Sequence, residues 1–266
     1  MKLFFRKIGQ GPPLIILHGL YGSSDNWVSV AKSISHKFTI YLPDQRNHGR
    51  SPHDDKHDYN SLCNDLLEFA DDHKLASFFL AGHSMGGKTA IYFTVKYPER
   101  VSGLVVADIS PFENADKNPR ALEQHKIIIK TFNELRISDA TSRKEIDERM
   151  SHMIVSEKIR NLIMKNLERE TDRGFRWKLN VRALQGNILN MMEGLPAPRD
   201  NYQEITGFPV LFLKGEFSDY LPDGDIPHIL KIFPGVEFRV IKNSGHWIHS
   251  DNPEAVTEAL LSLLDN

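Results

Sequence analysis

The sequence predicts an α/β fold in which helices flank a mostly parallel central sheet. Over about the first 110 residues, short continuous apolar runs alternate with amphipathic segments, as expected when strands are buried on both faces. The same alternation returns after residue 205. Between these two parts the chain is charged and helical in pattern, and no linker-like stretch isolates it. We therefore expect an insertion into one domain.

The N-terminal part is expected to contain four strands after a first one near the N-terminus. Residues 1–7 carry apolar side chains but no run long enough for a signal peptide, so they fit a first strand better. Leu14–Leu17 is a short apolar run typical of a buried strand. In chain order, the predicted strands cover residues 14–17, 38–42, 77–81 and 101–107, and helices lie at about 25–34, 62–70 and 89–95.

The charged middle of the chain is expected to form a helical lid at residues 112–204, inserted after the sixth strand. The core then consists of residues 1–111 and 205–266. Amphipathic patterns without strong strand runs predict lid helices at about 122–132, 146–153, 159–167 and 181–192. The core resumes with strands at 209–214 and 236–241 and helices at 226–233 and 253–264.

Composition excludes several classes of protein. The chain has 266 residues, 40% hydrophobic and 26% charged, which is ordinary for a globular protein. Its net charge of −2 argues against a nucleic-acid partner. No apolar run approaches the ~20 residues of a membrane span. Cys63 is the single cysteine, so the chain cannot form an internal disulfide. We expect its thiol to be buried and the protein to be cytoplasmic, because a lone cysteine fits a reducing compartment. The oligomeric state, monomer or dimer, stays open.

The segment Gly82-His83-Ser84-Met85-Gly86-Gly87 is a G-x-S-x-G motif between a predicted strand and a predicted helix. That context is typical of a nucleophile elbow, in which the serine occupies a strained turn. Small residues must flank such a turn, and Gly82 and Gly86 do so. We expect Ser84 to be the nucleophile and the Met85 N–H to face a developing oxyanion.

Serine needs a base within hydrogen-bond reach. His246 follows the last predicted strand of the sheet, next to Gly245, so its loop can place an imidazole over the elbow. The oxyanion hole needs a second N–H. His18-Gly19-Leu20 follows the 14–17 strand, and we expect the Leu20 N–H to supply it.

Together these motifs resemble the α/β-hydrolase superfamily over almost the whole chain. The fourth motif is Asp44–Ser51, which matches the D-x-R-x-x-G-x-S loop of that family. The resemblance implies a structural role for this loop, with Arg46 pairing with carboxylates or carbonyls. More narrowly, R-N-H-G-R-S-P, G-H-S-M-G-G-K and D-I-S-P resemble small bacterial carboxylesterases with mitochondrial relatives.

The resemblance leaves two candidates for the acid behind the histidine. Many superfamily members carry it as G-x-x-D after the strand that follows the lid, but here that region reads Gly215-Glu216-Phe217-Ser218-Asp219. The small-esterase branch has its acid at the end of the strand before the lid, where this chain has Asp108. A carboxylate there needs a partner to be buried. We favour Asp108, with Asp219 as the alternative.

The resulting prediction is a serine hydrolase that cleaves short- to medium-chain acyl esters without a metal or organic cofactor. A serine at position 84 excludes the haloalkane and epoxide chemistries of relatives with an aspartate nucleophile. Acyl-CoA thioester cleavage is the nearest alternative, followed by lactone, amide or carbon–carbon bond hydrolysis; a non-enzymatic ligand-binding protein is a further one. Basic lid residues could bind a CoA phosphate or form a solvated face. They are Lys126, Lys130, Arg136, Arg143 and Lys144. The lid methionines could line an acyl pocket or pack as core.

Overall fold

A seven-stranded sheet forms the centre of the computed structural model, which describes residues 1–112, 116–170, 174–195 and 203–264. The strand order is β1-β3-β2-β4-β5-β8-β9; β1 is antiparallel to β3, and all other neighbours are parallel. The predicted mostly parallel α/β sheet is thus confirmed. Its strands are β1 (Phe5–Gly9), β2 (Pro13–Leu17), β3 (Thr39–Pro43), β4 (Phe78–His83), β5 (Val101–Ala107), β8 (Val210–Gly215) and β9 (Val236–Ile241).

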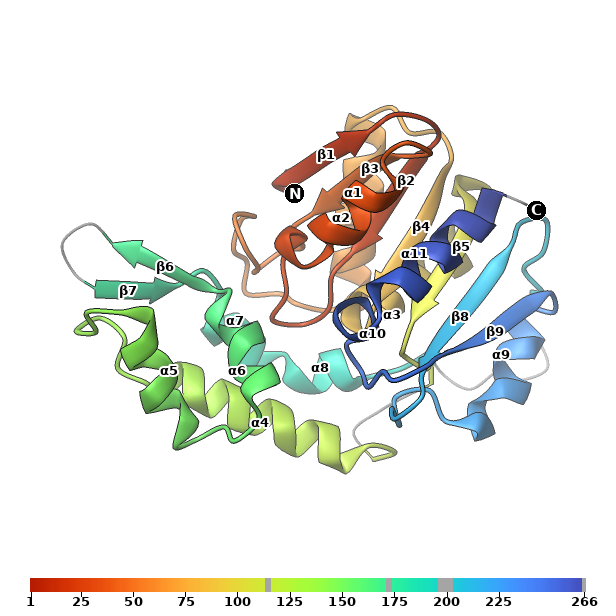
Figure 1. The fold of residues 1–266 in the computed structure, drawn as a ribbon. Helices are drawn as coiled ribbons and strands as arrows, with labels where there is room; N and C mark the ends of the chain where they lie inside the picture. Colours follow the sequence, from red (N-terminus) through yellow and green to blue (C-terminus); the bar gives the residue numbers. More distant parts are fainter. Residues whose placement is uncertain (113–115, 171–173, 196–202, 265–266) are drawn as a thin grey trace.

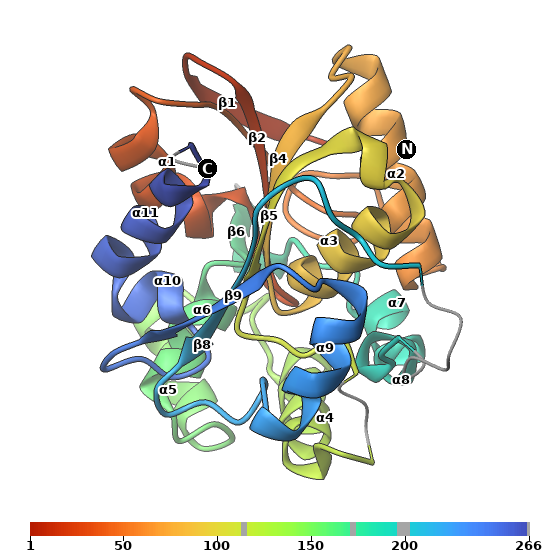
Figure 2. The same cartoon turned by 90° about the vertical axis from the view of Figure 1, so that its right-hand side faces the viewer.

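Helices cover both faces of this sheet (Figure 2). On β2, Leu14 and Ile16 belong to the core on the side of α1 and α11, whereas Ile15 and Leu17 belong to the core on the side of α2, α3 and α9. Successive strand residues point to opposite faces, so a strand covered on both sides must be apolar throughout. The core helices are α1 (Val28–Ile34), α2 (Tyr59–Asp72), α3 (Met85–Lys96), α9 (Ile226–Ile232), α10 (Ile248–Asp251) and α11 (Pro253–Leu261).

The segment between β5 and β8 lies at the carboxyl ends of the parallel strands (Figure 1). It follows the fifth strand of the chain, so its predicted place after the sixth strand is wrong. Its apolar side chains form a cluster of their own, which also includes Tyr21 from the core. The elements are α4 (Pro119–Glu134), α5 (Arg143–Ser151), α6 (Glu157–Met164), β6 (Leu167–Glu170), β7 (Gly174–Trp177), α7 (Val181–Gly186) and α8 (Ile188–Met192).

Two details of this segment differ from the prediction. An antiparallel hairpin, β6–β7, starts at Leu167, where a helix was expected to continue. Its strands have four residues each, and half of these eight side chains are charged and exposed, including the paired Glu168 and Arg176, so the strands lack an apolar strand signal. The expected helix at 181–192 is divided into α7 and α8 at Asn187.

The Asp44–Ser51 loop is structural, as its motif implied. Arg46 donates from Nε and Nη2 to the two carboxylate oxygens of Asp65 on α2, at 2.6 and 2.9 Å. Both side chains are buried. Cys63, on the same helix, is buried and free, as expected. Within the part of the chain that the structure describes, no helix is long and apolar enough to cross a membrane.

Candidate active site

Ser84 occupies a sharp turn between β4 and α3, with a positive φ of 53° and ψ of −119°. Glycines on both sides make the turn possible. A Cβ on Gly82 would lie 2.2 Å from the Gly86 carbonyl oxygen, and a Cβ on Gly86 would lie 2.5 Å from that of Leu17. The Ser84 N–H donates to the Ala107 carbonyl on β5 at 3.1 Å, which holds the turn against the sheet. The predicted strand–turn–helix setting of Ser84 is present, and its strain is of the kind found at functional sites.

His246 lies in the loop after β9, and its Nδ1 is 2.8 Å from Oδ2 of Asp108. Asp108 directly follows β5, is fully buried and has a positive φ of 51°. The structure therefore brings together the predicted base and the favoured acid. Asp219 is placed elsewhere: its side chain is 69% exposed, and it lies 4.0 Å from the guanidinium of Arg120.

Two further donors satisfy the buried carboxylate of Asp108. The Gly215 N–H donates to Oδ1 at 2.7 Å, and the Ser218 hydroxyl donates to Oδ2. Ser218 stands where a G-x-x-D motif starting at Gly215 would place its aspartate. At that position this chain has a hydrogen-bond donor, which stabilises the negative charge of Asp108. An aspartate at the same position would instead repel that charge.

Two aromatic side chains that were not predicted from the sequence to belong to the site hold His246 in place. Tyr220 stacks on the imidazole with ring centroids 3.7 Å apart and an angle of 19°. His83 Nε2 lies 2.8 Å from the His246 carbonyl oxygen. Burial lowers the pKa of His83 well below its usual value, so the ring is neutral and Nε2 donates this hydrogen bond. His83 could have been noticed because it lies inside the G-x-S-x-G motif, but no sequence signal marks Tyr220.

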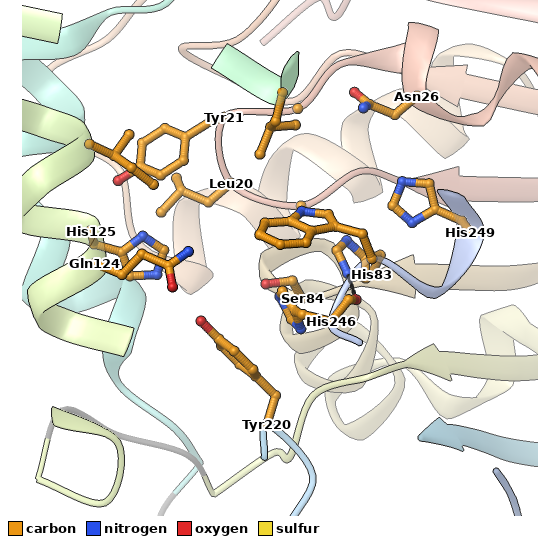
Figure 3. Close-up of a pocket in the computed structure, with 15 residues that line it drawn as sticks. Leu20, Tyr21, Asn26, His83, Ser84, Gln124, His125, Tyr220, His246 and His249 are labelled. Atoms are coloured by element: carbon orange, nitrogen blue, oxygen red, sulfur yellow. Dashed lines mark hydrogen bonds between the residues drawn. The ribbon is translucent and has the colours of Figure 1, made fainter. Parts of the chain in front are cut away.

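Ser84 and His246 line the same cavity, and Figure 3 shows their side chains next to each other. Nδ1 of His246 is taken by Asp108, which leaves Nε2 as the nitrogen available to the serine. Among the described residues, no hydrogen bond joins the Ser84 hydroxyl to the imidazole. Such contacts are often long in ligand-free enzymes and shorten when a substrate binds.

The backbone N–H groups of Leu20 and Met85 have no hydrogen-bond acceptor within the described residues. The next N–H in the same loop, that of Tyr21, donates to His48 Nε2 at 3.2 Å and is therefore occupied. A Cβ on Gly19 would lie 2.8 Å from His83 Nδ1, so the loop approaches the elbow closely only with glycine there. Within the described residues, neither predicted oxyanion donor is thus engaged by another acceptor, and their role as oxyanion donors stays a prediction.

Ser84 lies between two cavities that share Leu20, Ser84, His125 and Tyr220. The histidine-side cavity, of about 30 Å³, is further lined by His246, Trp247 and residues of α4 and α6. The methionine-side cavity, of about 20 Å³, is lined by Met85, Lys88, Ile109, Met191, Met192 and Tyr59.

The inserted segment thus supplies walls to both cavities. Met191 and Met192 line the space beside Ser84, whereas Met150 and Met164 pack in the segment's own core. Two of these methionines therefore line a cavity beside Ser84, and two others pack as core; an acyl-binding role for the first two stays a prediction. Within the described residues, no group of three or more His, Cys, Asp or Glu side chains is placed to hold a metal ion.

Comparison with known proteins identifies the family of this chain. The alpha/beta hydrolase fold family matches residues 12–253. The chain belongs to this family. The α/β-hydrolase is 32% identical over 260 residues to the sn-1-specific diacylglycerol lipase ABHD11 of Xenopus laevis, covering 96% of this chain and 80% of that protein. It is 28% identical over 262 residues to the esterase YbfF of Escherichia coli, covering 96% and 93% of the two chains.

Among solved structures, a marine microorganism esterase superimposes on this α/β-hydrolase with a TM-score of 0.92 and 44% sequence identity. The match covers 98% of this chain and 99% of that one. These relatives confirm the expected resemblance to the esterase branch and the expectation of a carboxylesterase-type hydrolase.

Proposed function

We propose that this α/β-hydrolase cleaves carboxylic esters with short- to medium-chain acyl groups through an acyl-enzyme formed on Ser84. The observation that carries the proposal is the 2.8 Å contact between His246 Nδ1 and the buried carboxylate of Asp108, beside a serine in an elbow. A histidine held in this way has its Nε2 free to act as a base. Asp219 is too exposed and too differently placed for this role.

In the proposed reaction, the Ser84 hydroxyl oxygen attacks the ester carbonyl while His246 Nε2 takes the hydroxyl proton. The carboxylate of Asp108 stabilises the imidazolium that forms and fixes the ring's tautomer. The tetrahedral intermediate collapses as His246 passes the proton to the departing alkoxide, which leaves as the alcohol. Water, activated by the same imidazole, then attacks the acyl-enzyme, releases the carboxylic acid and restores Ser84.

The oxyanion of both tetrahedral intermediates is assigned to the N–H groups of Leu20 and Met85. Within the described residues, these N–H groups have no other acceptor, which supports this role because a preorganised donor needs no rearrangement during the reaction. Each such donor is worth about 10²–10³ in kcat in related chemistries. The residues named in this scheme supply the nucleophile, the base and the oxyanion donors.

No observation favours thioester cleavage over ester cleavage. The basic lid residues considered for a CoA phosphate largely pair with acidic neighbours on their own helices. Lys126 pairs with Glu123 at 2.6 Å, Lys130 with Glu134 at 3.9 Å and Lys144 with Glu148 at 3.7 Å. These exposed pairs fit a solvated face.

The proposal is tested by assaying p-nitrophenyl esters of increasing acyl length and by labelling with a fluorophosphonate. We expect turnover of the short esters and a covalent adduct at Ser84. Comparison of kcat/KM for acyl-CoA and aryl esters distinguishes a thioesterase. Folded protein that neither turns over esters nor takes up the probe would indicate a ligand-binding protein.

The cytoplasmic location stays a prediction.

A further inference from the structure

The two cavities beside Ser84 differ in whether they reach the proton donor for the leaving group. His246 lines the histidine-side cavity and, within the described residues, not the methionine-side cavity. In the proposed mechanism, the departing alkoxide receives its proton from His246 Nε2, so the alcohol part must lie on the side of the imidazole. The acyl part is then directed to the other side of Ser84, into the methionine-side cavity.

The wall of the methionine-side cavity is fixed by hydrogen bonds to the backbone of α8 and the residue after it. Buried Lys88, on the elbow helix α3, donates from Nζ to the carbonyls of Met192 and Glu193 at 3.3 and 3.0 Å. The hydroxyl of Tyr59, on α2, donates to the Met191 carbonyl at 2.9 Å. Both contacts tie the inserted segment to the core, so this wall is held in place.

The methionine-side cavity is also small. Its volume of about 20 Å³ is close to the space that one water molecule needs. Met85 and Met191 pack there against Tyr59 and Leu62 in one apolar cluster. A chain of several methylenes therefore fits only if this packed wall moves, whereas an acetyl group needs little rearrangement.

The histidine-side cavity, by contrast, adjoins a larger space at the surface. It shares Asn26, Leu162, Trp247 and His249 with a surface groove of about 380 Å³. The groove is lined mainly by polar side chains, including Lys158, Lys165, Asn161 and Ser250. The side-chain amide of Gln124, on α4, also points toward the space between Ser84 and Tyr220 (Figure 3). An alcohol part can thus be long and can contact polar groups.

We propose that the enzyme is specific for esters of short-chain acids with larger, polar alcohols, the acyl group lying against Met191 and Met192 and the alcohol along Leu162 and Trp247 into the groove. This inference rests on the proposed function, because it uses His246 as the proton donor. Residues 191 and 192 then limit the acyl length, and Lys88 and Tyr59 act as positioning residues for that wall.

Three esters of matched size test the inference. Hexyl acetate and ethyl hexanoate are isomers that exchange the long and the short side, and diethylene glycol monoacetate replaces hexyl with a polar chain of equal length. We expect kcat/KM for hexyl acetate to exceed that for ethyl hexanoate by about tenfold or more, as for a pocket that rejects extra methylenes. Diethylene glycol monoacetate should be cleaved at least as fast as hexyl acetate.

Variants on the two sides of Ser84 provide matched controls. Met191→Ala enlarges the acyl side and should move the ratio of ethyl hexanoate to hexyl acetate toward one. Leu162→Ala, an equivalent truncation on the alcohol side, should not relieve the limit on acyl length. Circular dichroism and the thermal midpoint establish that each variant is folded.

The wild-type enzyme decides the matter even if a variant fails to fold. If ethyl hexanoate is cleaved as fast as hexyl acetate, the inference about short acyl chains is wrong. If hexyl acetate is cleaved much faster than diethylene glycol monoacetate, the inference about polar alcohols is wrong. Either result leaves the proposed function standing. Cleavage of none of the three esters, together with no fluorophosphonate labelling, would overturn the proposed function itself.

Discussion

His246 Nδ1 and Asp108 Oδ2 lie 2.8 Å apart although the two residues are 138 positions apart in the chain. The residues follow β9 and β5, and β8 lies between these strands in the sheet. The last residue of β8 contributes the Gly215 N–H to the same carboxylate, and the turn after β8 contributes the Ser218 hydroxyl. Three strand ends therefore converge on one buried anion, which in turn orients the imidazole.

This arrangement predicts that Asp108→Asn lowers kcat for a p-nitrophenyl ester by about 10²–10⁴-fold, because an amide neither stabilises the imidazolium nor enforces the same tautomer. Asp219→Asn is the matched control and should retain kcat close to wild type, since that side chain is 69% exposed. Steady-state kinetics on both variants checks the assignment. Equal activity in the two variants would remove both residues from the acid role.

Lys88→Met should weaken the link between α3 and the segment after α8. The substitution keeps an unbranched side chain but leaves the carbonyls of Met192 and Glu193 without their donor. An unsatisfied buried polar group costs about 1–3 kcal/mol, so the thermal midpoint should fall. The preference for short acyl chains should also broaden. Lys96→Met, at the exposed end of the same helix, serves as the control; identical behaviour of the two variants would contradict the anchoring role.

Asp65→Asn tests the structural role of the Asp44–Ser51 loop. It leaves the buried Arg46 guanidinium without its bidentate partner, and breaking a buried pair in this way typically costs about 3–5 kcal/mol. Asp71→Asn is the comparison, because the Asp71 side chain is 60% exposed and its pair with Arg100 should contribute about 1 kcal/mol or less. Urea unfolding of both variants gives the two free energies. A smaller loss for Asp65→Asn than for Asp71→Asn would be inconsistent with this account.

Buried histidines predict a loss of stability on acidification. Burial lowers the pKa of His57 and of His249 to about 3 and that of His125 to about 4, all from an ordinary 6.5. Below about pH 6.5 these histidines bind protons in the unfolded chain but not in the folded chain. Their contribution to the free energy of unfolding is therefore greatest above this pH and decreases as the pH falls toward the folded-state pKa values. Each such group contributes roughly 1.4 kcal/mol per pH unit within that window.

Urea unfolding at about pH 7.5 and about pH 5.5 measures this effect, because most carboxylates are ionised at both values. We expect a clearly lower midpoint at the more acidic pH. His57→Gln should reduce the difference between the two conditions. A midpoint that is the same at both would show that these rings do not stay neutral in the folded protein.

The sequence was most informative where chemistry and backbone geometry are set locally. Leu14–Leu17 was predicted to be a strand covered on both faces because all four residues are apolar, and the structure confirms this. The glycines around Ser84 predicted a turn that larger residues cannot adopt. The hairpin β6–β7 was not predicted because half of its strand residues are charged and its strands pair with each other within the inserted segment.

Contacts between distant segments were also beyond local patterns. Tyr220 stacks on His246 only because the chain after β8 passes beside the loop after β9, and nothing near position 220 indicates it. The sequence left two candidates for the acid for the same reason. Their distances from the imidazole depend on how the ends of three strands are arranged in the sheet.

The central claim is that Ser84 becomes acylated with help from His246. The most direct measurement combines peptide mass spectrometry after fluorophosphonate labelling with turnover of a short p-nitrophenyl ester, for wild-type enzyme and for Ser84→Ala. We predict a single adduct on the peptide that contains Ser84 in the wild type, no adduct in the variant, and a kcat lower by about 10³–10⁶-fold in the variant. A folded Ser84→Ala protein that keeps full activity, or an adduct on another residue, would contradict the account.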